Sequence, residues 1–153
     1  MIGPETLGME ILKPVVALAA WTMMMWLWMY ATRLPAMNRA GIDAKSLTGG
    51  TGKSLDEVLP PPVQWKAHNY NHLHEAPTVF YAVALVLAIV GQGDGFNAML
   101  GWAYVGLRVL HSLVQATLNR VIVRFALFAL SSLVLIALTF HAAIAVFDWH
   151  LLG

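Results

Sequence analysis

The stretch from Trp65 to Tyr81 combines histidines, amides and a carboxylate at the start of an apolar run. Four of its polar side chains recur at the spacing i, i+3, i+4 and i+7, namely His68, Asn71, His72 and Glu75. A helix with 3.6 residues per turn places such residues on one face. A carboxylate beside a hydrophobic segment is costly unless a cation meets it, so we expect Glu75 to have a basic partner.

Two further polar faces occur later in the chain. The first is spaced 0, +3, +4, +7 and +11 in an apolar stretch and consists of Arg108, His111, Ser112, Gln115 and Asn119. The second consists of Arg120, Arg124, Phe128 and Ser131. Because Arg108 also lies well inside an apolar segment, we expect it to form a bidentate pair with Glu75.

These charged residues have two interpretations. A Glu75–Arg108 pair alone could serve only to fix helix packing and register. The whole set of arginines and histidines exceeds what one ion pair requires, and it favours an anionic ligand such as a carboxylate, phosphate or thiolate. For Arg120 the simpler interpretation is a side chain that extends to lipid headgroups.

A metal or haem site is the competing hypothesis for the histidines. His68 and His72 have the i, i+4 spacing that can chelate one ion, and Glu75 or His111 could add ligands. His72 and His111, on separate helices, could also bind a haem axially. The neighbouring arginines repel cations, so we predict no metal site. We interpret His141, deep in the last apolar segment, as a packed and hydrogen-bonded residue.

The composition indicates a membrane environment. The chain has 153 residues, of which 59% are hydrophobic and 11% charged, too apolar for a soluble domain of this size. We predict one all-α domain over residues 1–153, a membrane-embedded four-helix bundle with spans at about 12–32, 65–91, 96–118 and 119–147. There is no cysteine, so any thiol chemistry must arrive with a ligand, and the formal net charge of +1 gives no reason to expect nucleic acid.

The polar segment between the first two spans contains GGTGKS at 49–54. A phosphate-binding loop would need glycine in place of Leu47 and a preceding strand, so we predict a flexible loop with turn chemistry. Lysine and arginine occur in this loop and at the junction of spans three and four, but not between spans two and three. This predicts that the first and third loops are cytoplasmic and that both termini lie on the other side.

Two stretches resemble motifs of the MAPEG superfamily, the membrane-associated proteins in eicosanoid and glutathione metabolism. NYNHLHEAPTVFY (69–81) is similar to the family's Asn-x-x-Glu, followed by proline, at the start of helix two. RVLHSLVQATLNRVIVRF (108–125) is similar to its Arg-x-x-His and Arg-x-x-x-Arg pattern in helices three and four. With the chain length, the four spans and the long first loop, the likeness covers essentially the whole chain, which looks like a divergent bacterial-type member.

The resemblance implies a homotrimer in a bacterial inner membrane, with glutathione bound between subunits near the cytoplasmic side. Glu75 would match the family glutamate, Arg108 and His111 the helix-three pair, and Arg120 and Arg124 the helix-four arginines. The second helix-four arginine commonly lies near the glutathione sulfur, where positive charge lowers the pKa of a thiol. The thiolate then attacks a lipophilic electrophile or reduces a hydroperoxide.

The chain departs from the family pattern at three positions. His72 stands where the family usually has asparagine, with Asn71 beside it as a further binding candidate. Gln115 and Phe128 replace tyrosines that commonly contact the peptide; the amide can still hydrogen-bond, whereas the phenyl ring cannot. Two functions therefore stay open: a glutathione transferase- or peroxidase-like enzyme with Arg124 as its catalytic residue, and a non-catalytic scaffold or accessory subunit of a larger membrane complex.

Overall fold

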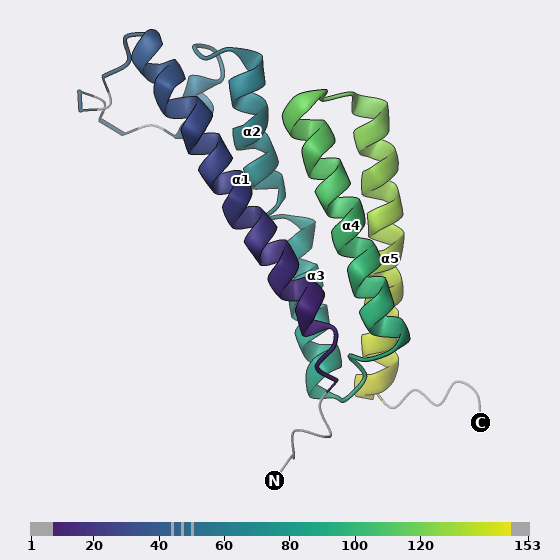
Figure 1. Cartoon of the computed structure of the whole chain (residues 1–153). Coiled ribbons are helices and arrows are strands. Elements are labelled where there is room, and N and C mark those ends of the chain that lie inside the picture. Colours follow the sequence, from purple (N-terminus) through teal and green to yellow (C-terminus); the bar gives the residue numbers. More distant parts are fainter. Residues whose placement is uncertain (1–7, 44, 47, 50, 148–153) are drawn as a thin grey trace.

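The computed structural model describes residues 8–43, 45–46, 48–49 and 51–147, and all regular elements in these ranges are helical. They are α1 (Leu12–Arg39), the 3-10 helix η2 (Gly52–Leu55), α2 (Pro61–His72), α3 (Ala76–Ile89), α4 (Phe96–Thr117) and α5 (Val121–Phe147). In Figure 1, α2 and α3 follow one another along the bundle and pack with α1, α4 and α5. The predicted all-α four-helix bundle is confirmed.

Three stretches are long and apolar enough to cross a membrane: Leu12–Arg39, Pro61–Ile89 and Val121–Phe147. The most apolar segment of Val121–Phe147 is only 11% buried within the chain. Helix α5 therefore presents most of its surface to lipid or to a neighbouring subunit. Helix α4 is about 33 Å long at 1.5 Å per residue. It is less apolar because one face carries Arg108, His111, Ser112 and Gln115, all of which are buried. The chain is therefore a multi-pass membrane protein.

Both ends of the bundle are defined by loops (Figure 1). The long first loop and the α4–α5 turn lie at one end, and the α3–α4 turn lies at the other, with the first turn of α1. The start of the second span and the junction of the last two helices therefore lie at the same end, as predicted from their basic residues. Which end faces the cytoplasm stays a prediction.

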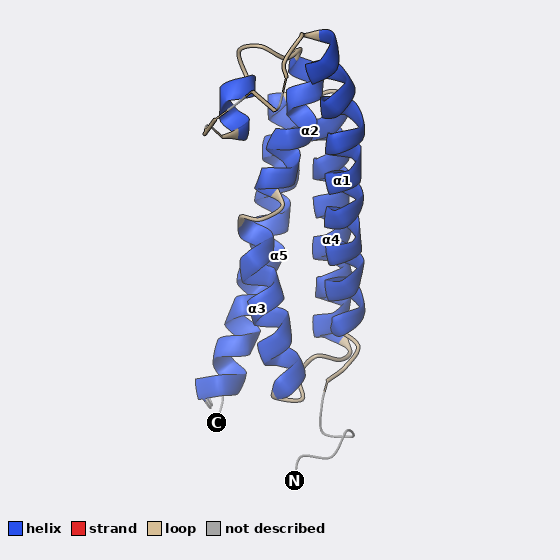
Figure 2. Cartoon of the chain, turned by 90° about the vertical axis from the view of Figure 1, so that its left-hand side faces the viewer, coloured by secondary structure: helices blue, strands red, loops and turns tan. Residues whose placement is uncertain are grey.

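The second span differs from the single helix predicted over 65–91. It begins earlier, at Pro61, because proline fits the first helical turn, where no backbone N–H is required. It is also interrupted between His72 and Ala76, and Figure 2 shows a short non-helical link there. Pro77 has no N–H to donate to the carbonyl of Leu73, and Glu75 takes φ −91° and ψ −105°, outside the helical region.

The core contains both apolar contacts and a buried polar junction. Phe80 of α3 and Tyr104 of α4 are fully buried and stack with ring centroids 4.5 Å apart. The hydroxyl of Ser112 accepts hydrogen bonds from Asn69 Nδ2 at 2.7 Å and from Trp21 Nε1 at 3.0 Å. This junction joins α1, α2 and α4, and Ser112 is the residue next to His111 of the site.

Candidate functional site

Arg108 is the most deeply buried charged residue of the described chain, with 1% of its surface exposed. Its Nε donates to the hydroxyl of Tyr104 at 3.1 Å. The guanidinium carbon lies 5.5 Å from the Tyr104 ring centroid and 5.4 Å from that of Phe128. Nη1 and Nη2 have no hydrogen-bond partner among the described residues. The outer fork of the guanidinium is thus free to bind a planar anion.

His72 lies between Glu75 and His111 at the break between α2 and α3. Its Nδ1 is 2.7 Å from Glu75 Oε2, and its ring centroid is 4.9 Å from that of His111 on α4. The Glu75 side chain is 67% exposed, whereas the His72 side chain is 19% exposed. The expected Glu75–Arg108 pair is not formed within this chain. The helix break places Glu75 at the surface, while Arg108 lies on the inner face of α4.

Arg124 of α5 lies near His72 and His111. Its Nη1 donates to Asn119 Oδ1 at 2.7 Å, and Asn119 forms the tight α4–α5 turn with φ +50°. A cavity of about 230 Å³ is lined by His72, His111, Val121, Arg124, Phe125 and Phe128. The three polar residues of this set come from three helices, so the sequence-predicted faces of His72, His111 and Arg124 do converge.

Several buried side-chain atoms have no hydrogen-bond partner in the described chain, and two of them belong to His72 and Arg124, which line this cavity. The unpaired atoms are Asn69 Oδ1, His72 Nε2, Arg108 Nη1 and Nη2, Gln115 Oε1 and Arg124 Nε, with Arg33 Nε nearer the first loop. Native proteins leave few buried polar atoms unpaired, because each costs about 1–3 kcal/mol or more when charged. This set therefore marks a surface that a ligand or a neighbouring subunit completes.

A model of the MAPEG family matches residues 11–144. The chain belongs to the MAPEG family. No curated protein and no solved structure matches it significantly. MAPEG proteins are membrane helical bundles that include glutathione-dependent transferases and peroxidases as well as non-catalytic members. Membership therefore confirms the resemblance and the fold, and the activity has to be argued from the site.

Of the predicted site residues of this MAPEG chain, His72, His111 and Arg124 line the cavity of about 230 Å³, and the others lie outside its lining. Arg120 is exposed in the turn directly before α5. Asn71 and His68 of α2 line a second cavity of about 540 Å³, together with Arg33 of α1 and Lys53 of η2. Of the four polar residues predicted on one face of the second span, His68 and Asn71 line the second cavity and His72 lines the first. Glu75 follows the break after α2 and lines neither.

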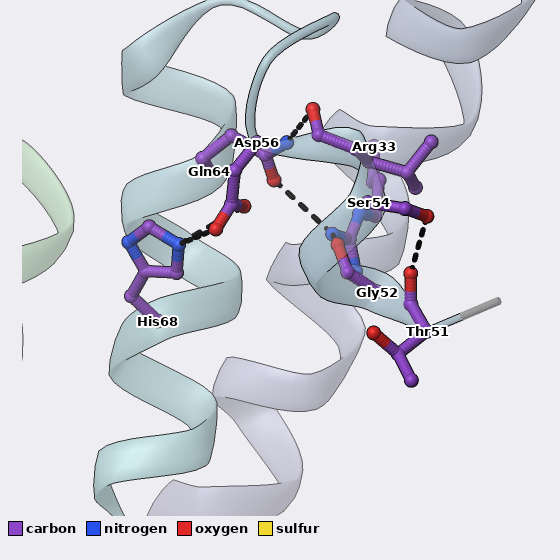
Figure 3. Close-up of polar contacts among 8 residues, drawn as sticks. Arg33, Thr51, Gly52, Ser54, Asp56, Gln64 and His68 are labelled. Carbon is purple, nitrogen blue, oxygen red and sulfur yellow. Dashed lines mark hydrogen bonds and ion pairs between the residues drawn. The ribbon is translucent and has the colours of Figure 1, made fainter.

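Residues 51–53 and 56 of the first loop line part of the second cavity, and polar contacts attach this loop to α1 and α2 (Figure 3). Arg33 Nη2 donates to the Gly52 carbonyl at 2.7 Å and to Gln64 Oε1 at 3.1 Å, and His68 Nε2 lies 3.1 Å from the Asp56 carboxylate. The Ser54 hydroxyl donates to the Thr51 carbonyl at 2.7 Å. The described part of the GGTGKS segment thus forms a turn and the short helix η2, and side chains attach it to α1 and α2.

Several contributors to the site are not evident from spacing alone. Tyr104, one helical turn before Arg108, holds its Nε, and Asn69 belongs to the buried junction at Ser112. For Tyr104, the available signal in the sequence was its i, i+4 spacing from Arg108.

His141 hydrogen-bonds to Asn97 Oδ1 at 2.6 Å, in agreement with its predicted packed role. The described residues contain no group of three or more histidine, cysteine or acidic residues able to hold a metal ion.

Proposed function

We propose that this chain is a glutathione-dependent transferase- or peroxidase-like membrane enzyme that acts on a lipophilic electrophile or hydroperoxide. The observation that supports this most strongly is the unpaired guanidinium fork of Arg108, 1% exposed, at the polar end of the bundle. In the described chain neither Arg108 nor Arg124 forms an ion pair with an acidic side chain. Glutathione has carboxylates that fit such a fork and a thiol whose anion a nearby arginine stabilises.

The arrangement suggests a role for each predicted residue. Arg108, with the free Oε1 of Gln115 and the ring of His111, would position the peptide. Glu75 is largely exposed at the mouth of the site, where one carboxylate oxygen can accept from the peptide's ammonium group. His72, Asn71 and Arg120 are further binding candidates around this end. Arg124, whose Nε is free, would hold the thiolate.

The chemistry that this site would support is thiolate attack. With a carbon electrophile, the sulfur forms a bond to carbon, and the leaving group departs with the electron pair. With a hydroperoxide, the sulfur takes the terminal oxygen, the O–O bond breaks, and the alkoxide is protonated to the alcohol. A second glutathione then converts the sulfenic acid to a disulfide and water. In both cases Arg124 would stabilise the thiolate and so raise the fraction of glutathione that is ionised and able to attack.

We also propose that the working unit is a homotrimer with its sites between subunits. The cavity of about 230 Å³ in one chain is smaller than the ~300–1,000 Å³ of typical ligand sites, so a neighbouring copy would add walls. The apolar surface of α5 leaves room for such a contact and for lipid. We place the sites near the cytoplasmic side of a bacterial inner membrane, with the termini opposite.

The proposal is tested with protein in lipid nanodiscs, glutathione and an aryl halide acceptor. Arg124→Ala should lower kcat about 100-fold or more, because the anion loses its stabilising charge, while light scattering shows an unchanged oligomer. Arg39→Ala, at the exposed end of α1, is the matched control and should keep the activity. If millimolar glutathione causes no thermal shift of the intact oligomer, the proposed function is wrong.

One observation favours the non-catalytic alternative, a scaffold or accessory subunit of a larger membrane complex. The Phe128 ring fills the space beside Arg108 and lies 5.9 Å from the His72 ring, without a hydroxyl to contact a peptide. Under this alternative, the chain co-purifies with another membrane complex and gives no thermal shift with glutathione. Isolation only as a free trimer that turns over glutathione excludes it.

A further inference from the structure

The two nitrogens of the His72 ring have different environments. Nδ1 lies 2.7 Å from the Glu75 carboxylate, which accepts only if Nδ1 carries the proton. In the neutral ring this leaves the lone pair on Nε2. Nε2 is buried and has no hydrogen-bond partner in the part of the chain that the structure describes. The ring is thus oriented by a carboxylate on one side and free to accept a proton on the other.

The cavity next to His72 suits a nucleophile. Arg124 lines the same space of about 230 Å³, and the aromatic rings of Phe125 and Phe128 make one side of it apolar. The charged or titratable groups around the ring are Glu75 from the α2–α3 link, Arg108 and His111 from α4, and Arg124 from α5. A base oriented by a carboxylate, next to a site for an anion, is the arrangement that activates weak nucleophiles.

Resting on the proposed function, we propose that His72 is the general base that deprotonates the thiol bound in this cavity. The S–H bond breaks, its electron pair stays on sulfur, and the proton moves to His72 Nε2. Glu75 stabilises the imidazolium that forms, and Arg124 stabilises the thiolate. After sulfur attacks, the proton passes from His72 to the departing group or to water. The arginines favour the anion, and the histidine accepts its proton.

A structural role predicts different behaviour from a catalytic one. If the His72–Glu75 contact only closes the break between α2 and α3, a residue that donates to Glu75 should replace the histidine. Asparagine and glutamine keep an N–H donor but cannot accept a proton at neutral pH. His72→Asn and His72→Gln therefore separate the two roles.

The matched control is His74→Asn. His74 is two residues away and exposed; its Nδ1 contacts the Tyr70 carbonyl at 2.8 Å, and it does not line the cavity. The variants are compared with the native chain in nanodiscs, with glutathione and an aryl halide. Glutathione affinity is measured by calorimetry, and the pH profile of kcat/KM by initial rates.

We expect His72→Asn to lose about 10²–10⁴-fold in kcat, far more than it loses in glutathione affinity. The limb of the pH profile set by the imidazole should disappear, so that activity rises only as the free thiol ionises. Added imidazole should restore part of the activity of His72→Ala, and His74→Asn should behave as the native chain.

The outcomes distinguish the two proposals. If His72→Asn or His72→Gln keeps the native kcat and pH profile in an active enzyme, His72 is not the base and the proposed function stands. If the intact native oligomer neither binds nor turns over glutathione, the proposed function fails and the role of His72 in it fails too.

Discussion

The guanidinium of Arg108 is buried with one hydrogen bond, to Tyr104, and an unpaired outer fork. Uncompensated buried charge is unfavourable, and an apolar side chain of similar volume is often more stable by about 1–4 kcal/mol. A residue kept at such a cost is typical of a binding site rather than of a packing contact. Gln115 of the same helix also has a buried Oε1 without a hydrogen-bond partner in the described chain, so it too lowers stability in a way that is typical of a binding site.

Arg108→Met tests this at the residue scale. We expect the free energy of unfolding in mixed micelles to stay unchanged or rise by about 1–4 kcal/mol, while glutathione binding measured by calorimetry is lost. Tyr104→Phe, which removes only the hydroxyl that accepts from Nε, is the comparison. A marked fall in the stability of Arg108→Met would mean that the arginine is paired in the assembled protein and is structural.

Ser112→Ala removes the acceptor of two buried donors, Asn69 Nδ2 and Trp21 Nε1. Each donor left unsatisfied costs about 1–3 kcal/mol, so we expect a loss of at least ~1 kcal/mol in the free energy of unfolding. Ser132→Ala is the control, because that hydroxyl bonds only to the Phe128 carbonyl of its own helix. Equal stability of the two variants would contradict the role given to the junction.

The burial of single residues was predictable where the helical periodicity determined which face of the helix they occupy. Arg108, His111 and Gln115 recur at helical spacing, and all three are buried as expected. The partner of Glu75 was not predictable in this way, because a pairing depends on the distance between helices and on local breaks. Glu75 meets His72, three residues earlier, rather than Arg108 across the bundle.

At the scale of elements, the break between α2 and α3 determines the geometry of the site. Pro77 is fully buried and stands at the start of α3, where its ring prevents the helix from continuing through Leu73. The break lets Glu75 reach back to His72. A continuous helix would turn the carboxylate to another face, because each residue advances about 100° around the axis.

Pro77→Ala should therefore join α2 and α3. We expect amide hydrogen exchange at residues 73–78 to slow, and glutathione affinity to fall as Glu75 leaves the mouth of the site. Pro61→Ala is the matched control, since Pro61 is exposed in the first turn of α2, where the amide needs no partner. Unchanged exchange at the link in Pro77→Ala would show that tertiary packing, not proline, produces the break.

The existence of the helices was predictable from apolar length, but some of their ends were not. The sequence predicts the second span at about 65–91, whereas the helix begins at Pro61, within three consecutive prolines at 60–62. Helix α1 continues past the expected end near residue 32 to Arg39, although it contains Pro35. Charge indicates where the apolar core of a membrane ends, and a helix can extend beyond that boundary.

At the scale of the whole molecule, the orientation in the membrane follows from the loops. The chain has no cysteine, so single cysteines can be introduced without background. We expect Lys53→Cys to react with a membrane-impermeant maleimide only in inverted vesicles, and Gln92→Cys only in intact cells, because basic loops stay cytoplasmic. Both positions are exposed. The reverse labelling pattern would place the site on the opposite side.

The bundle could be inferred from composition and spans, but the assembly could not. Nothing in the periodicity of one chain states how many copies meet, and the unpaired atoms of Arg108, Gln115 and Arg124 can be satisfied by a ligand or by another subunit. The central claim is that a small anionic thiol peptide satisfies them.

The most direct measurement is a structure of the assembled protein determined in lipid with millimolar glutathione. We predict a trimer with peptide density between Glu75 and Arg124, a carboxylate on the Arg108 fork and the sulfur near Arg124 and His72 Nε2. A structure in which side chains of a neighbouring subunit occupy Arg108 and Arg124, with no peptide density, would contradict it.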